Sequence, residues 1–128
     1  MVSFDALRPD ALGVYGYDRG TSPNLDAFAR EAIVFENAYS AAPKTPTSFA
    51  AAFTGRHPTD AFRGWRLVGH PTLAELFREA GYHTAAFANN PQLVAERGFG
   101  RGFETYRVTP AHDDARVVRD ALAWLAGS

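Results

Sequence analysis

The stretch TLAELFREAGYHTAAFA, residues 72–88, predicts a helix followed directly by a strand. Thr72 and Glu75 have the spacing of a capping box, in which each side chain bonds the other's backbone N–H. The apolar residues that follow recur at helical spacing, at Leu73, Leu76, Phe77 and Ala80. Gly81 can adopt the left-handed conformation that ends a helix, and the short apolar run His83–Ala88 is typical of a strand.

The same alternation of helices and strands extends along the chain in both directions. We expect helices over residues 22–32, with Ser22 as cap, and over 113–125, with Val118, Ala121, Leu122 and Leu125 facing inward. Shorter helices are expected near Pro46 and Pro91, and further strands at Val2–Phe4, Ile33–Phe35 and Thr105–Val108. This pattern predicts a single α/β domain around a largely parallel sheet, with sites at the carboxyl ends of the strands.

Composition excludes several classes of protein. The chain has 128 residues, a formal net charge of −1 and no cysteine, so disulfides, thiolate metal sites and cysteine nucleophiles are excluded. No run approaches the roughly 18 to 20 apolar residues that span a bilayer, and Met1–Asp5 lacks the features of a signal peptide. A cytoplasmic location is therefore the default expectation. Nucleic acid is not favoured as a partner, because acids and bases nearly cancel and no basic cluster occurs.

Asp5 is the first candidate for a functional residue. It follows the expected strand Val2–Phe4, and the carboxyl end of a strand is where α/β sheets place metal ligands and catalytic groups. The structural alternative is a turn or cap, a role that aspartate commonly has after a strand.

Thr45 is the second candidate. The sequence predicts it as the N-cap of a short helix that begins at Pro46 and stops at Gly55, which by itself requires no function. A hydroxyl in this place also faces free N–H groups, which favour an alkoxide or a bound phosphate or sulfate. A divalent cation nearby could make it a nucleophile. Thr47 and Ser48 are rival hydroxyls that local sequence does not rank.

The histidines give no metal motif. His57, His70, His83 and His112 do not pair at helical spacing, and we expect each to be a surface or loop residue. His57 is the best placed of them, just after the candidate helix. The glycine-rich stretch 98–103 lacks the patterns of phosphate-binding loops and is expected to be a loop.

The chain resembles the N-terminal portion of the sulfatase-like hydrolase family, part of the alkaline phosphatase superfamily. The resemblance is carried, in order along nearly the whole chain, by residues 2–13, 15–17, 21–26, 35–40, 54–55, 71–75, 80–85 and 102–104. It implies an α/β parallel-sheet sandwich of the alkaline phosphatase type, of which residues 1–128 would form only the N-terminal part of a catalytic domain.

The resemblance also implies roles for individual residues. Asp5 matches the family's first metal-ligand aspartate, although Ala6 stands where many members have a second. Counting back from Thr54-Gly55 places Thr45 at the nucleophile, also bound to the metal, Thr47 at a conserved proline and Phe49 at an arginine. Threonine at the nucleophile position is similar to the phosphotransferase branch of the family, whose members act on head-group phosphodiesters.

These roles imply a metal-dependent hydrolase or transferase that acts on sulfate or phosphate esters through a threonine nucleophile. The implied cofactor is a divalent ion (Ca²⁺, Mn²⁺, Mg²⁺ or Zn²⁺), and the implied substrate is a small-molecule, glycan or lipid ester. Asp5 and Thr45 alone offer too few oxygens for Ca²⁺, so the chain by itself is expected to be inactive. The alternative is a truncated or degenerate family member without catalysis, and the oligomeric state stays open.

Overall fold

The computed structural model describes residues 1–109 and 113–127, which fall into two compact units, one of residues 1–39 and one that begins at Ser40. The first unit contains two single-turn 3-10 helices, η1 (Pro9–Ala11) and η2 (Gly13–Tyr15), and one α-helix, α1 (Pro23–Ala29). Pro23 occupies the first turn of α1 as predicted, because the missing N–H of proline is not needed there.

A buried serine joins the helices of the first unit. Ser22 was expected to cap α1, but its side chain makes no capping bond. Its hydroxyl instead accepts the N–H of Gly13 at 2.9 Å and lies 3.0 Å from a carboxylate oxygen of Asp26. Asp26 also accepts the N–H of Val14 at 2.8 Å. These bonds satisfy polar groups of η2 that would otherwise lack partners.

The strands predicted in the first unit are wrong. Val2–Phe4 and Ile33–Phe35 form no strand in the structure, and Ile33 is 85% exposed. A strand needs a neighbour that satisfies its backbone N–H and C=O groups. Among residues 1–109 and 113–127, no segment pairs with either run.

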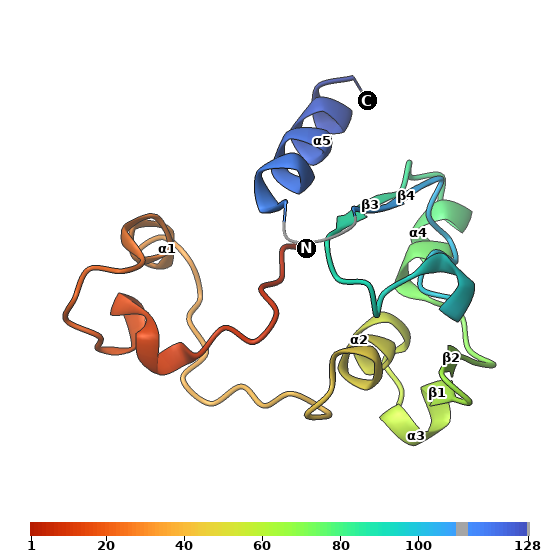
Figure 1. Ribbon diagram of the computed structural model, residues 1–128, viewed down its shortest axis with the longest axis horizontal. Helices are drawn as coiled ribbons and strands as arrows, with labels where there is room; N and C mark the ends of the chain where they lie inside the picture. Colours follow the sequence, from red (N-terminus) through yellow and green to blue (C-terminus); the bar gives the residue numbers. More distant parts are fainter. Residues whose placement is uncertain (110–112, 128) are drawn as a thin grey trace. The chain divides into compact units, whose positions relative to one another are not determined.

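The second unit carries most of the regular structure (Figure 1). Along the chain its elements are α2 (Thr45–Thr54), α3 (Pro58–Ala61), β1 (Phe62–Arg63), β2 (Arg66–Leu67), α4 (Leu73–Glu79), β3 (Ala85–Ala88), η3 (Ala95–Arg97), β4 (Thr105–Val108) and α5 (Asp114–Gly127). The predicted capping box of α4 is confirmed: Thr72 Oγ1 accepts the N–H of Glu75 at 3.1 Å, and Glu75 accepts the N–H of Thr72 at 2.7 Å.

The described strands form two small sheets. β3 and β4, both predicted from the sequence, pair in parallel with Ala85 opposite Thr105 and Ala88 opposite Val108. β1 and β2 form an antiparallel hairpin that the sequence analysis did not predict. Its turn is made by Gly64 and Trp65, with φ of 56° and 62°, as the tight turns that match strand twist require. The described chain is therefore a mixed α/β structure with short sheets.

The helix predicted near Pro91 is also wrong, because the chain turns there. The side-chain oxygen of Asn90 accepts the N–H of Gln92 at 2.8 Å, and its backbone carbonyl accepts the N–H of Leu93 at 3.1 Å. An asparagine that bonds nearby N–H groups in this way competes with helix formation. The next helical turn is η3, which begins at Ala95.

The core of the second unit is aromatic. Phe99 is fully buried and packs with four other buried residues, Ala50, Ala61, Leu67 and Leu93. Phe53 and Phe62 contact its ring, with centroid distances of 6.3 and 5.9 Å. Tyr106 borders the cluster, and burial raises the pKa of its hydroxyl to about 12. Its hydroxyl donates to the carbonyl of Leu93, which fixes the turn after Pro91 to β4.

Candidate functional site

Thr45 lies in the first turn of α2. The carbonyl of Lys44 accepts the N–H of Ser48 at 2.9 Å, so Lys44 is the N-cap and Thr45 the first helical residue. The predicted N-cap is therefore one residue too late, because the helical hydrogen bonding already begins at Lys44. Thr45 is half-buried, and its hydroxyl belongs to the end of the helix where unbonded N–H groups create positive potential.

The rival hydroxyls are both engaged in local hydrogen bonds. Thr47 Oγ1 donates to the carbonyl of Lys44 at 2.9 Å. Ser48 Oγ lies 2.7 Å from Ser40 Oγ. These bonds do not rank either residue against Thr45 as a nucleophile.

Phe49 is a packing residue. Its ring contacts Phe53 edge-on, with centroids 5.7 Å apart, and it packs against the buried cluster around Phe99. The position that the family resemblance assigns to an arginine is thus occupied by an aromatic side chain of the core. Phe49 offers no donor to a developing negative charge.

Asp5 lies in a turn rather than at the end of a strand. It is exposed, and the following residue, Ala6, has a φ of 55°, which is unusual for a residue other than glycine. Asp5 belongs to the first unit and Thr45 to the second. The ion that these residues are predicted to share therefore stays a prediction.

The described residues do not make a complete metal site. A carboxylate and a hydroxyl suit a hard divalent cation, but Ca²⁺ takes about six to eight oxygen ligands. Within the part of the chain that the structure describes, no group of three or more His, Cys, Asp or Glu side chains gathers closely enough to hold an ion. Asp5 and Thr45 would have to be joined by further ligands.

Two of the histidines have structural roles. The side chain of His57 precedes α3 and accepts the N–H of Thr59 at 3.4 Å, so it caps that helix. His83 lies 2.9 Å from Glu104 at the surface, and its hydrogen bond lowers the pKa of that carboxylate. His112 lies outside the described residues. The expectation of surface or loop positions is confirmed for His57 and His83.

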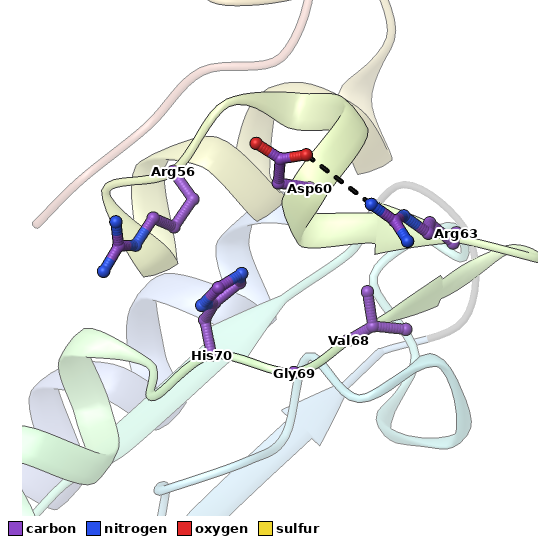
Figure 2. A pocket seen from close by; sticks show the side chains of 6 residues that line it. All are labelled: Arg56, Asp60, Arg63, Val68, Gly69 and His70. Atoms are coloured by element: carbon purple, nitrogen blue, oxygen red, sulfur yellow. Dashed lines mark ion pairs between the residues drawn. The ribbon is translucent and has the colours of Figure 1, made fainter.

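His70 lines an open depression at the other end of α2, which the sequence analysis missed. Figure 2 shows that it is bordered by Arg56, just after the helix, by Asp60 and Arg63, and by the segment Val68–His70. Its volume is about 540 Å³. The lining residues are spread over 15 positions of sequence, from 56 to 70, and the hairpin brings them together. No periodic pattern in the sequence marks them.

Arg101 fixes one wall of this depression. Its guanidinium donates to the backbone carbonyl of His70 at 2.8 Å and to both carboxylate oxygens of Glu75, at 3.2 and 2.9 Å. Burial raises the pKa of Glu75, but the N–H of Thr72 and the Arg101 guanidinium outweigh this effect, and the net pKa is lowered. Glu75 is therefore ionised at neutral pH.

Comparison with known proteins identifies a family for almost the whole chain and individual relatives for parts of it. Residues 1–121 match the model of the family described as Sulfatase. An arylsulfatase of Clostridium perfringens is 37% identical over 66% of this chain and 18% of its own length. A Delta 4,5-hexuronate-2-O-sulfatase of Bacteroides thetaiotaomicron is 31% identical over 77% of this chain and 22% of its own length. The human N-acetylgalactosamine-6-sulfatase is 38% identical over 56% of this chain and 17% of its own length.

The matched relatives are much longer than this chain. The aligned region spans about a fifth of their length, from 17% to 22% in these three proteins. No solved structure shows a significant match to the chain. In the described residues, no helix is long and apolar enough to cross a membrane.

Proposed function

The chain belongs to the sulfatase family, and we propose that it forms the N-terminal part of a catalytic domain of the alkaline phosphatase type. The proposed activity is hydrolysis or transfer at a sulfate or phosphate ester, with Thr45 as nucleophile and Asp5 as a metal ligand. The observation that carries the proposal is the family match over residues 1–121, together with the place of Thr45 in the first turn of α2.

The proposed reaction has two steps at the Thr45 hydroxyl. In the first, Oγ1 loses its proton and attacks the sulfur or phosphorus, and the bond from that atom to the leaving oxygen breaks. The leaving alcohol takes up a proton, and a threonine ester remains. In the second, water or an acceptor alcohol attacks the same atom, the bond to Oγ1 breaks, and Thr45 regains its proton.

The N-terminal turn of α2 favours this chemistry. Unbonded backbone N–H groups at a helix start stabilise negative charge such as that of a sulfate or phosphate group. Pro46 is buried and anchors this turn; because it has no N–H, the donors to an anion would be the other unbonded N–H groups of the turn. A divalent cation, when bound, would supply further positive charge at the ester oxygens, and its remaining ligands would come from beyond Asp5 and Thr45.

Substitution of Thr45 tests the proposal. The test protein contains this chain together with the later part of a sulfatase domain, and is assayed with an aryl sulfate and an aryl phosphodiester in the presence of Ca²⁺, Mn²⁺, Mg²⁺ or Zn²⁺. Thr45→Ala should abolish turnover, since it removes the hydroxyl that is proposed to form the covalent ester, whereas Thr45→Ser should keep part of it. Activity retained in Thr45→Ala would remove the nucleophile assignment.

Thr47→Ala provides the matched control for loss of a hydroxyl in the same helical turn. Its hydroxyl bonds the carbonyl of Lys44, so the substitution should change stability slightly and leave turnover near that of the parent. If Thr47→Ala abolished activity and Thr45→Ala did not, the nucleophile would have to be moved to Thr47.

A non-catalytic family member is the second candidate, and the packing of Phe49 favours it. An arginine at that position would stabilise charge in the transition state, but Phe49 lies against the aromatic core instead. Thermal unfolding of the same extended protein with added Mn²⁺, Ca²⁺ or Zn²⁺ separates the candidates, because a ligand that binds the folded state raises Tm. A rise in Tm that Asp5→Asn removes would support the metal-dependent enzyme, and an unchanged Tm would favour the second candidate.

A further inference from the structure

We propose that the depression at the C-terminal end of α2 binds a small organic anion that carries a sulfate or phosphate group. The depression is lined by Arg56, Asp60, Arg63, Val68, Gly69 and His70. Nothing in this inference depends on Thr45 or on the proposed function. An ideal helix rises about 1.5 Å per residue, so the ten residues of α2 separate Thr45 from this site by about 15 Å.

The charge of the lining favours an anion. Two guanidinium groups, of Arg56 and Arg63, face a single carboxylate, Asp60, in a chain whose overall formal charge is −1. Arg63 is partly neutralised, since it lies 3.6 Å from Asp60 and also donates to the carbonyl of Thr59 at 3.0 Å. In the described structure, the guanidinium of Arg56 and the imidazole of His70 make no ion pair or side-chain hydrogen bond.

The arrangement of these groups suits a tetrahedral oxyanion. Figure 2 shows Arg56 reaching down from the end of α2, with its guanidinium on the side away from Asp60 and Arg63, and His70 rising from the segment below it, while Arg63 is turned toward Asp60. Arginine presents several N–H donors in a plane and bonds phosphate-like groups through two of them. Arg56 is therefore the principal donor, with His70 as the second and Arg63 supplying charge at the rim.

The walls are held in place before any ligand binds. The N–H of Val68 donates to the carbonyl of Ala61 at 2.8 Å, which ties this segment to the end of α3. On the other side, Arg101 donates to the carbonyl of His70 at 2.8 Å and is itself held by Glu75. A site whose walls are already ordered loses less conformational entropy on binding.

The size of the depression indicates more than a bare ion. Its volume of about 540 Å³ lies in the range of roughly 300–1,000 Å³ found for small-molecule sites. The side chain of Val68 adds an apolar surface beside the charged groups. A sugar-sized body with one sulfate or phosphate group fits this combination.

Calorimetric titration of the 128-residue chain tests the proposal, with glucose 6-sulfate and glucose 6-phosphate as probes and glucose as the uncharged control. Both anions should bind saturably and glucose should not. If neither anion binds saturably, the proposal is overturned.

Two variants test the role of Arg56. Arg56→Gln should weaken binding about tenfold or more, because it removes a charge-assisted hydrogen bond. Arg119→Gln is the matched control: it removes the same charge from an exposed position of α5 that does not line the depression, and it should leave the affinity unchanged. Equal weakening in both variants would show non-specific attraction and overturn the site. Circular dichroism should show both variants folded, since both side chains are exposed.

Discussion

A single glycine shows how closely two segments approach in the second unit. Gly102 is buried, with a φ of +84°. A Cβ atom built on it would lie 2.2 Å from the backbone nitrogen of Glu75 and 2.5 Å from the carbonyl carbon of Ala74. The segment before β4 therefore passes directly against the start of α4, which explains why glycine is required in the Gly102-Phe103-Glu104 motif.

Gly102→Ala should lower the free energy of unfolding more than the same substitution does at a glycine that has a left-handed backbone but open space around it. Gly81→Ala is the control, because Gly81 has a similar φ of +88° and nothing lies within 4 Å of its added Cβ. Both variants bear the cost of a left-handed alanine, about 1–2 kcal/mol. We expect Gly102→Ala to lose about 1–3 kcal/mol more, as forced packing does. Urea denaturation measures both, and equal losses would contradict the close approach.

At the scale of elements, the Glu75–Arg101 pair joins α4 to the chain segment before β4. Thr72, fully buried, adds to this junction, because its hydroxyl lies 3.1 Å from the carbonyl of Arg101 as well as capping α4. The same guanidinium bonds the carbonyl of His70, so one residue fixes a helix start, a loop and the wall of the depression. Loss of the pair should loosen all of these together.

The pair gives stability a predictable dependence on pH. The folded-state pKa of Glu75 lies below the ordinary value of 4.5, so its stabilising contribution is complete above about pH 4.5 and is lost as pH falls through the folded pKa. Glu75→Gln should lower stability at pH 7 by about 1–2 kcal/mol. The difference in stability between the parent chain and Glu75→Gln should become smaller below pH 4.5. Thermal unfolding across pH 3 to 7 measures the difference in stability, and a difference that stays constant with pH would contradict the ion pair.

At the scale of the whole molecule, large apolar side chains remain exposed on both units. Phe28 and Phe35 in the first unit are 70% and 68% exposed. On α5, the residues expected to face inward include Val118, Leu122 and Leu125, which are 56%, 60% and 61% exposed. That expectation is wrong for these three residues, because the short sheet contacts only part of the helix. Exposed apolar surface of this kind promotes association.

The weight-average mass of the chain should therefore rise with concentration in sedimentation equilibrium. Leu122→Glu places a charge on the apolar face of α5 and should reduce this rise. Ala123→Glu adds the same charge at an exposed neighbouring position off that face and should not. A mass that is independent of concentration, or equal effects of the two substitutions, would contradict the role of this face.

Local sequence determined the elements whose signals are complete within a few residues. The capping box of α4, the proline start of α1 and the glycine that ends α2 need only neighbouring atoms, and each is found as predicted. The strands β3 and β4 were also predicted, and they pair with each other in parallel. Val2–Phe4 and Ile33–Phe35 have equally apolar sequences and form no strand, because pairing depends on a neighbour that sequence does not specify.

Tertiary structure alone decided which side chains meet. The hairpin of Gly64 and Trp65 brings Arg56 and His70 to one depression, and the turn at Asn90 replaces a predicted helix. For the proposed nucleophile, the sequence and the family resemblance pointed to Thr45 beside the start of a helix, and the structure places Thr45 inside the first turn of α2. A metal ion or an ester is held by several groups at once, and these groups come from segments far apart in the chain. Local sequence does not show which distant side chains meet, so the surroundings of Thr45 in a complete site depend on tertiary contacts.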